Sequence, residues 1–80
     1  MIDHVLVTIE TEKTRRDMEL PDKLPVDELS KKLLEVLREN LPSEFRNKDG
    51  ISLFYEGRQL IGGKSLSEQY VWDGSILKIR

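Results

Sequence analysis

Apolar and polar positions alternate over 4–10 and again over 16–20, which predicts two β-strands that each bury one face. The polar stretch between them, 11–15, suits a hairpin turn. The second strand is expected to end at the prolines of 21–25, because proline lacks the amide hydrogen that a sheet uses. The expected inward side chains are Val5, Val7, Ile9, Met18 and Leu20.

Apolar residues then recur at spacings of three and four, which predicts one strong amphipathic helix. Pro25 suits its start, and Asp27 and Glu28 favour the positive end of the helix dipole. The helix is expected to end at 40–42, because the residue before Pro42 is pushed out of the helical region. The apolar stripe consists of Val26, Leu29, Leu33, Leu34, Leu37 and Leu41.

Short strands and turns are expected in the second half. A polar connection over 42–50, which Phe45 would hold, leads into a third strand over 51–55. Gly57 supplies a tight turn into a short strand over 59–61. The inward side chains of the third strand are Ile51, Leu53 and Tyr55.

A glycine loop and a closing strand complete the pattern. We interpret Gly62 and Gly63 as loop glycines that allow positive φ. Asp73-Gly74 is a turn signal before the last strand, 76–80. The order is ββαββ with a short extra strand, and the remaining core residues are Leu66, Val71, Leu77 and Ile79.

The composition is that of one small domain, 1–80, with mixed charge. Thirteen basic residues are interleaved with 15 acidic ones, which leaves no basic face for nucleic acid. Without cysteine there is no disulfide and no thiolate metal site. The chain holds no apolar run of membrane-spanning length and no signal peptide. We therefore expect a cytoplasmic protein, a monomer or weak dimer, with no nucleic-acid binding and no direct membrane insertion.

The segment 53–80 resembles ubiquitin. Gly57-Arg58-Gln59-Leu60, Ser65-Leu66-Ser67-Glu68 and Ser75-Ile76-Leu77 follow one another in the order found in ubiquitin. The resemblance implies an α+β fold of the ubiquitin-like β-grasp type, in which a mixed sheet packs on one helix. It also implies that the first and last strands pair in parallel at the centre of the sheet.

Conjugation chemistry is not expected. Ubiquitin-like modifiers and sulfur carriers act through a C-terminal Gly-Gly, whereas this chain ends at Ile79-Arg80, inside its last expected strand. Cleavage after Gly62-Gly63 would remove that strand. By motif, the lysine most used for chain building in ubiquitin corresponds to Arg58, which cannot accept an isopeptide bond. We expect a protein that binds partners.

Two further patterns resemble a narrower family. Residues 18–29 read as hydrophobic, x, Leu-Pro, three residues, Pro-Val, two residues, Leu, and residues 71–77 read as aliphatic, x, Asp-Gly, x, x, Leu. Both resemble the YukD/EsaB family, small ubiquitin-like proteins of bacterial type VII (WXG100, ESAT-6-like) secretion systems. The resemblance implies a cytosolic accessory or adaptor protein that binds the cytosolic part of a membrane component of the secretion machinery. That partner would hold it at the inner face of the membrane.

No catalytic, metal or cofactor site is expected, so we do not expect an enzyme. His4 is the only histidine, and Asp3 beside it points to the opposite face of a strand. One histidine without cysteine makes a poor zinc site.

The outer face of the sheet is the candidate binding site. Alternation turns Phe54 outward, and its register from the Gly57 turn gives it the central place of ubiquitin's apolar recognition patch. An aromatic residue rimmed by cations suits a partner, although single exposed apolar residues are common on any surface. Trp72 is either half exposed or caps the core beside Tyr70. The expected partner-binding residues are Leu6, Phe54, Trp72, Lys78 and Arg80.

Two alternatives remain open. The chain is also compatible with a ubiquitin-like scaffold module of another system, excised from a larger protein. A β-grasp sulfur or acyl carrier would need an activatable C-terminal glycine, and Arg80 stands against it.

Overall fold

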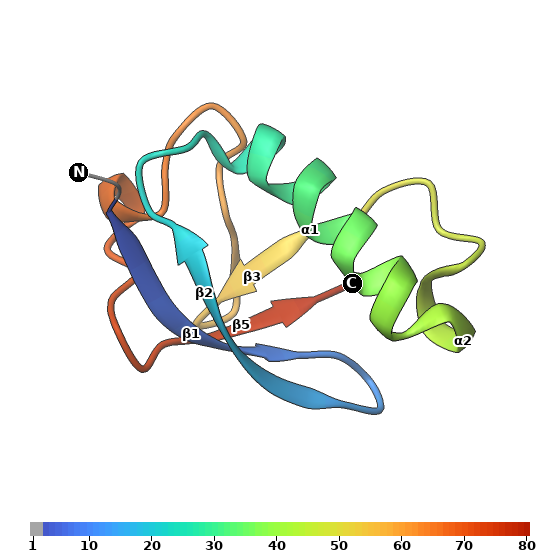
Figure 1. Cartoon of the computed structure of the whole chain (residues 1–80). Coiled ribbons are helices and arrows are strands. Elements are labelled where there is room, and N and C mark those ends of the chain that lie inside the picture. The colour runs from blue at the N-terminus through green and yellow to red at the C-terminus, as the bar shows by residue number, and fades with distance from the viewer. Residues whose placement is uncertain (1–2) are drawn as a thin grey trace.

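The computed structural model describes residues 3–80, in which one long helix crosses one face of a mixed sheet (Figure 1). The predicted hairpin, helix and closing strand are all confirmed. The elements are β1 (His4–Glu10), β2 (Arg15–Pro21), α1 (Val26–Asn40), α2 (Pro42–Phe45), β3 (Leu53–Tyr55), β4 (Arg58–Gln59), a 3₁₀ turn η1 (Ser67–Gln69) and β5 (Ile76–Ile79).

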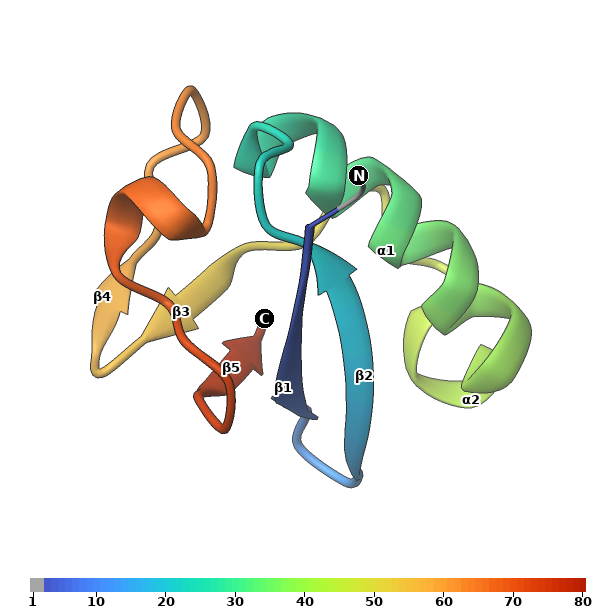
Figure 2. The ribbon, with the colours of Figure 1, turned by 60° about the vertical axis from the view of Figure 1, so that its left-hand side comes forward.

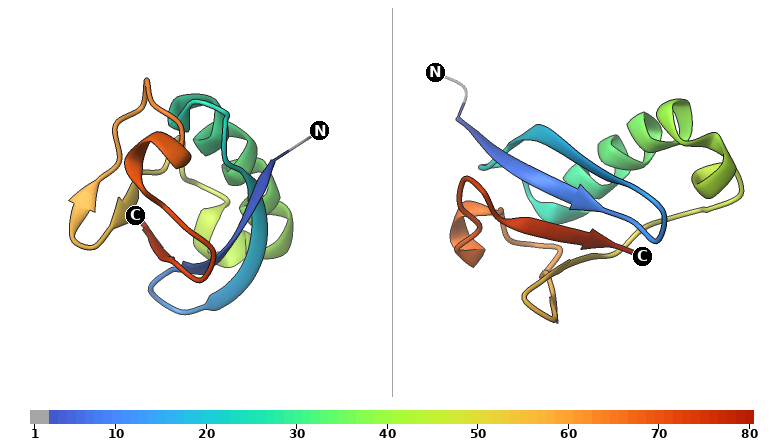
Figure 3. Two further views of the ribbon diagram at one scale, coloured as in Figure 1. Left: turned by 90° about the vertical axis from the view of Figure 1, so that its left-hand side faces the viewer. Right: turned by 90° about the horizontal axis from the view of Figure 1, so that it is seen from below.

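The strands lie in the order β2-β1-β5-β3-β4 (Figure 2). The central pair, β1 and β5, is parallel, and the other three pairs are antiparallel. Ile9 of β1 lies opposite Leu77 of β5, which lies opposite Tyr55 of β3. The first and last strands therefore form the centre of the sheet, as the resemblance to ubiquitin implies (Figure 3).

The core lies between α1 and the sheet. Leu37, Leu66 and Leu77 are completely enclosed, and Leu66 and Val71 close one end of the core as predicted. Four expected inward residues lie at its margins and are half-buried against it, namely Met18, Leu41, Ile51 and Tyr55. The buried apolar residues are Val5, Val7, Ile9, Leu20, Val26, Leu29, Leu33, Leu34, Leu37, Phe45, Leu53, Leu60, Leu66, Val71, Leu77 and Ile79.

The second strand ends at Pro21, within the range expected, but Pro21 is itself part of β2 and does not interrupt its hydrogen bonds. Asp22 donates its amide hydrogen to the carbonyl oxygen of Asp3, 3.2 Å away, so that pair is hydrogen-bonded across the hairpin. Pro21 and His4 form the next pair along, and in an antiparallel ladder the next pair is not hydrogen-bonded. The nitrogen of Pro21 faces away from β1, so its missing hydrogen removes no bond.

Two boundaries differ from the expectations. The strand expected at 59–61 lies at Arg58–Gln59, because the Gln69 side chain forms the hydrogen bonds of the Ile61 backbone that a neighbouring strand would otherwise form. Gln69 Oε1 accepts the amide hydrogen of Ile61 at 2.6 Å, and Gln69 Nε2 donates to its carbonyl at 2.9 Å. The connection over 42–50 contains α2, four residues that are too few to show a period, and Phe45 is buried there as expected.

The glycines divide into two classes. Gly57 and Gly74 have φ values of 79° and 88°, as their turns require. The expectation of positive φ at Gly62 and Gly63 is wrong. The carbonyl of Gly62 accepts the Asp27 amide hydrogen at 2.9 Å, and a Cβ at Gly62 would collide with the Asp27 carboxylate. Gly62 is therefore a contact point between the loop and the start of α1.

Ser65 and Glu68 form a capping box before β5. The Glu68 carboxylate accepts the Ser65 amide hydrogen at 3.0 Å and its hydroxyl hydrogen at 3.1 Å, and the Glu68 amide donates back to the hydroxyl. The hydrogen bond from the Ser65 amide, and after it the one from the Ser65 hydroxyl, lower the pKa of Glu68 below its ordinary value, because both favour the ionised carboxylate.

Candidate functional site: the outer face of the sheet

The face of the sheet opposite α1 carries four of the five candidate residues, because α1 buries the alternate positions. On this face Phe54 lies opposite Lys78, and Lys78 is the neighbour of Glu10 across the central pair. Arg80 follows two residues after Lys78, and its guanidinium carbon lies 5.6 Å from the centre of the Phe54 ring. Phe54, Lys78 and Arg80 therefore form one group, which we call the cationic end.

Phe54 is half-buried, which differs from the fully exposed aromatic residue that alternation predicts. The Arg80 side chain lies over the ring, in a cation–π contact that alternation cannot reveal. A partner would therefore meet the Arg80 guanidinium and the Phe54 ring as one stacked unit.

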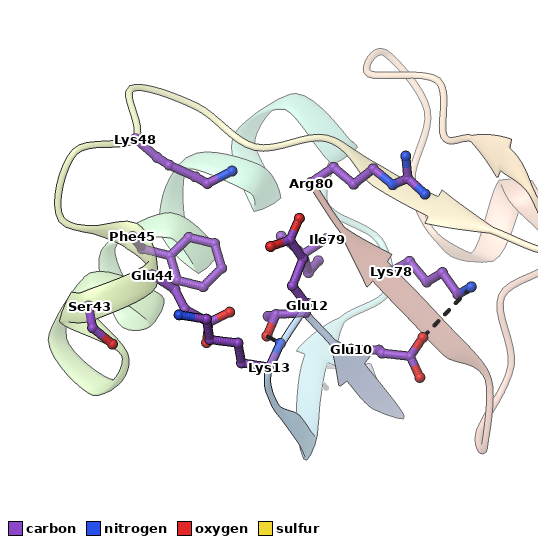
Figure 4. A pocket seen from close by; sticks show the side chains of 11 residues that line it. Glu10, Glu12, Lys13, Ser43, Glu44, Phe45, Lys48, Lys78, Ile79 and Arg80 are labelled. Carbon is purple, nitrogen blue, oxygen red and sulfur yellow. Dashed lines mark hydrogen bonds and ion pairs between the residues drawn. The ribbon is translucent and has the colours of Figure 1, made fainter.

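One of the two cations of the cationic end, Lys78, is held by an ion pair with Glu10. Lys78 Nζ lies 3.8 Å from Glu10 Oε1 (Figure 4). Arg15 Nε lies 2.8 Å from Glu10 Oε2. The Lys78 and Arg15 side chains are largely exposed and Glu10 is half-buried, so the pairs fix geometry more than they stabilise the fold. Within residues 3–80, Arg80 forms no ion pair, so of the two cations of this end it is the one more available to an acidic group.

Leu6 and Trp72 lie at the opposite end of the same region. The amide of Leu6 donates to the Asp73 carboxylate at 2.8 Å, and its carbonyl accepts from the Gly74 amide at 2.8 Å. The turn after Trp72 is thus bonded to β1. Trp72 is 60% exposed and stacks at a tilt near Tyr70, with 6.2 Å between ring centres, while Val71 takes the core position. The exposed alternative for Trp72 is the one observed.

Ile76 joins the two ends and is absent from the sequence-based candidates. It pairs with Thr8, lies two positions from Lys78 on the same face and is 42% exposed. Alternation with the inward Leu77 was a sufficient signal for it. We call Leu6, Trp72, Tyr70 and Ile76 the apolar end; Leu6 is 48% and Tyr70 67% exposed.

A hollow of about 570 Å³ borders the cationic end (Figure 4). Phe45 and Ile79 are its apolar residues, and it lies between the β1–β2 turn, α2 and the end of β5. Its charged lining is mixed, with four basic residues and three acidic ones: Lys13, Lys48, Lys78, Arg80, Glu10, Glu12 and Glu44. The hollow depends on α2, which the sequence did not predict.

The described residues offer little for catalysis. His4 is exposed on β1. Within residues 3–80, no three His, Asp or Glu side chains converge on a possible metal position. None of the helices in that range is long and apolar enough to cross a bilayer.

Solved structures with this fold come from secretion systems and from other settings. The ubiquitin-like domain of the Mycobacterium tuberculosis type VII secretion protein ECCD1 is 25% identical, with a TM-score of 0.80 and 98% of each chain covered. The EccD5 ubiquitin-like domain from Mycobacterium xenopi is 22% identical, with a TM-score of 0.81, covering 98% of this chain and 93% of that one. A chain of the MycP5-free ESX-5 inner membrane complex is 27% identical, with a TM-score of 0.81. That match covers 96% of this chain but 20% of the other.

No curated protein matches the sequence. The family described as "WXG100 protein secretion system (Wss), protein YukD" matches residues 4–79, which include both hairpin strands, the helix and the closing strand. The fold is that of the ubiquitin-like domains of type VII secretion proteins. The chain therefore belongs to the YukD family of ubiquitin-like proteins of the WXG100, or type VII, secretion system.

Proposed function

We propose that this protein is a non-catalytic adaptor of a type VII secretion system, which acts in the cytoplasm by binding the cytosolic part of a membrane component. The observation that carries the proposal is the outer face of the sheet, where exposed apolar residues lie together with Arg80, which forms no ion pair within residues 3–80. Family membership supplies the setting. The similar domain in the ESX-5 inner membrane complex is one fifth of its chain, which supports a membrane-bound partner.

In this proposal the two ends of the face have different roles. The apolar end supplies area that leaves water on binding, at about 25 cal/mol per Å². The cationic end supplies Arg80, which would pair with an acidic side chain of the partner while its plane remains stacked on Phe54. Aromatic and arginine residues are the types that most often dominate binding energy at interfaces.

The proposal excludes conjugation through the internal glycine pair. Gly62 bonds to the start of α1, and the neighbouring Lys64 carbonyl accepts the Val26 amide hydrogen at 2.9 Å. Cleavage after Gly63 would separate β5 from the sheet and remove Leu77 from the core. The loop thus has a structural role, and we assign the protein to binding alone.

The test combines export with binding. In a strain that lacks the gene, secretion of the small WXG-type substrates is expected to fail and to be restored by wild type but not by Phe54→Ala or Arg80→Glu. Val36→Ala is the matched control, because Val36 is 39% exposed on α1, away from the sheet's outer face. Normal secretion in the deletion strain refutes a role in export. If both variants bind the purified cytosolic domains of the system's membrane components with unchanged affinity, the outer face is not the binding surface, although family membership is unaffected.

A further inference from the structure

β2 is a long edge strand whose outer side is open. It has seven residues and pairs with β1 alone, at one margin of the five-stranded sheet (Figure 2). The other margin, β4, has two residues. An open edge of this length has a row of backbone donors and acceptors that another strand can use.

The free backbone groups can be identified from the hydrogen bonds of β1. Leu6 donates to Asp73 and accepts from Gly74, and Thr8 donates to the Ser75 carbonyl at 2.9 Å, so both residues direct their backbone toward β5. Leu6 lies opposite Glu19 and Thr8 opposite Asp17.

Residues directly opposite in an antiparallel pair either exchange both bonds or exchange none. The amide and carbonyl groups of Asp17 and Glu19 therefore point away from β1, to the open edge. Within residues 3–80, no hydrogen bond satisfies these groups.

The side chains at this edge define what could bind there. Asp17 and Glu19 are exposed on the outer face, where the Thr8 hydroxyl donates to the Asp17 carboxylate at 2.7 Å. Neither carboxylate has an ion pair within the described part of the chain. On the opposite face of the same strand, Met18 is half-buried against the core. Over 17–19 the edge therefore has acids on one side and Met18 on the other. Arg15 and Arg16 precede this stretch on β2, and Arg15 is paired with Glu10.

We propose that β2 binds an extended segment of a partner protein as an additional antiparallel strand, with Lys or Arg opposite Asp17 and Glu19 and apolar residues between them. Main-chain bonds would give affinity, and the alternating side chains would give specificity. Opposite charges directly across a strand pair stabilise the pair. This surface goes beyond the proposed adaptor face and shares none of its residues.

A second copy of this chain is a poorer occupant. Antiparallel self-pairing that brings the free groups together sets Asp17 opposite Asp17, opposite Glu19 or opposite Arg15, and a fourth register, with Asp17 opposite Pro21, sets Glu19 opposite Glu19. The first two and the fourth place like charges directly across, which is destabilising. The third places Arg16 opposite Arg16 on the other face. A basic segment avoids all of these contacts.

The test uses a short synthetic peptide of alternating Lys and Val, with one of alternating Glu and Val as control, and amide hydrogen exchange measured by NMR. The Lys–Val peptide is expected to slow exchange at Asp17 and Glu19, and the control peptide is not. Met18 and Leu20 already bond to β1, so their exchange should change little. Glu19→Lys should weaken binding about tenfold.

Proline variants test the main-chain contribution. Glu19→Pro removes an outward amide hydrogen, as Pro21 does naturally in this strand, and should retain the fold by circular dichroism while losing the peptide. Met18→Pro, which removes an inward hydrogen bond to β1, should unfold the hairpin. Exchange at Asp17 and Glu19 unaffected by the Lys–Val peptide overturns the proposal, as does equal binding of the Glu–Val peptide. If the protein forms a concentration-dependent dimer without peptide, and exchange at these amides is slow in that dimer, the edge binds a second copy and the proposal is also overturned.

Discussion

Leu77→Ala should be strongly destabilising, because Leu77 is fully enclosed at the centre of the sheet, between Ile9 of β1 and Tyr55 of β3. The lost methine and methyl carbons, at about 0.8 kcal/mol each, amount to about 2.4 kcal/mol of transfer free energy. The cavity adds to this, because strands paired on both sides restrict collapse, and buried leucine truncations cost about 2–5 kcal/mol. We expect a loss of about 3–4 kcal/mol in the free energy of unfolding.

Such a loss is a large share of the total. A chain of 80 residues is expected to have a free energy of unfolding of about 4–12 kcal/mol, at about 0.05–0.15 kcal/mol per residue. Equilibrium urea denaturation followed by far-UV circular dichroism measures it directly. The matched control is Ile76→Ala on the same strand, because Ile76 faces outward and is 42% exposed. It should cost about 1 kcal/mol or less. A loss below about 1 kcal/mol for Leu77→Ala, or equal losses for both variants, would refute the assignment of the core.

Two further predictions concern the turns. Gly57→Ala should destabilise the protein by about 1–2 kcal/mol, since φ is 79° there and L side chains disfavour positive φ. Gly63 has no positive φ, and nothing lies within 4 Å of a Cβ added to it, so Gly63→Ala should be near neutral in the same denaturation assay. Equal costs for the two variants would contradict this reasoning. An NMR titration should place the pKa of Glu68 below its ordinary value in the wild type and closer to that value in Ser65→Ala. Because the folded-state pKa is the lower one, the stabilisation from Glu68 is present above the unfolded-state pKa and is lost as the pH falls through the folded-state value. A pKa unchanged by Ser65→Ala would exclude the Ser65 hydroxyl as a cause and leave the Ser65 amide hydrogen bond, which the variant retains.

Periodic elements were predictable and short ones were not. The helix α1 and the strand β1 contain enough apolar repeats to define their period and their buried face. The four residues of α2 show no period, and β4 ends where the Gln69 side chain replaces a strand partner, a contact that no local pattern encodes. The parallel pairing of β1 with β5 came from the resemblance to ubiquitin, since alternation alone does not specify a register.

The candidate face shows the same division. Alternation placed Leu6 and Lys78 outward correctly and would have placed Ile76 there too, because it follows from the inward Leu77. It could not show that Arg80 covers Phe54, since that contact depends on the rotamers of two side chains on different strands. The division of the face into a cationic end and an apolar end depends on register, which only the folded chain provides.

Phe54 and Glu19 lie far enough apart to test the two proposed surfaces separately, although Glu19 is opposite Leu6 of the apolar end. Phe54 is on β3 and Glu19 is on β2, with β5 and β1 between them. Three strand spacings of about 4.8 Å separate the two positions across the sheet by about 14 Å. Substitutions beyond about 7–10 Å that share no partner are usually additive. A variant at Glu19 that weakens binding at the face, or one at Phe54 that weakens peptide binding at the edge, would mean one of two things. Either one partner contacts both surfaces, or the two surfaces are coupled through Leu6, which lies opposite Glu19, or through Glu10, which pairs with both Arg15 and Lys78.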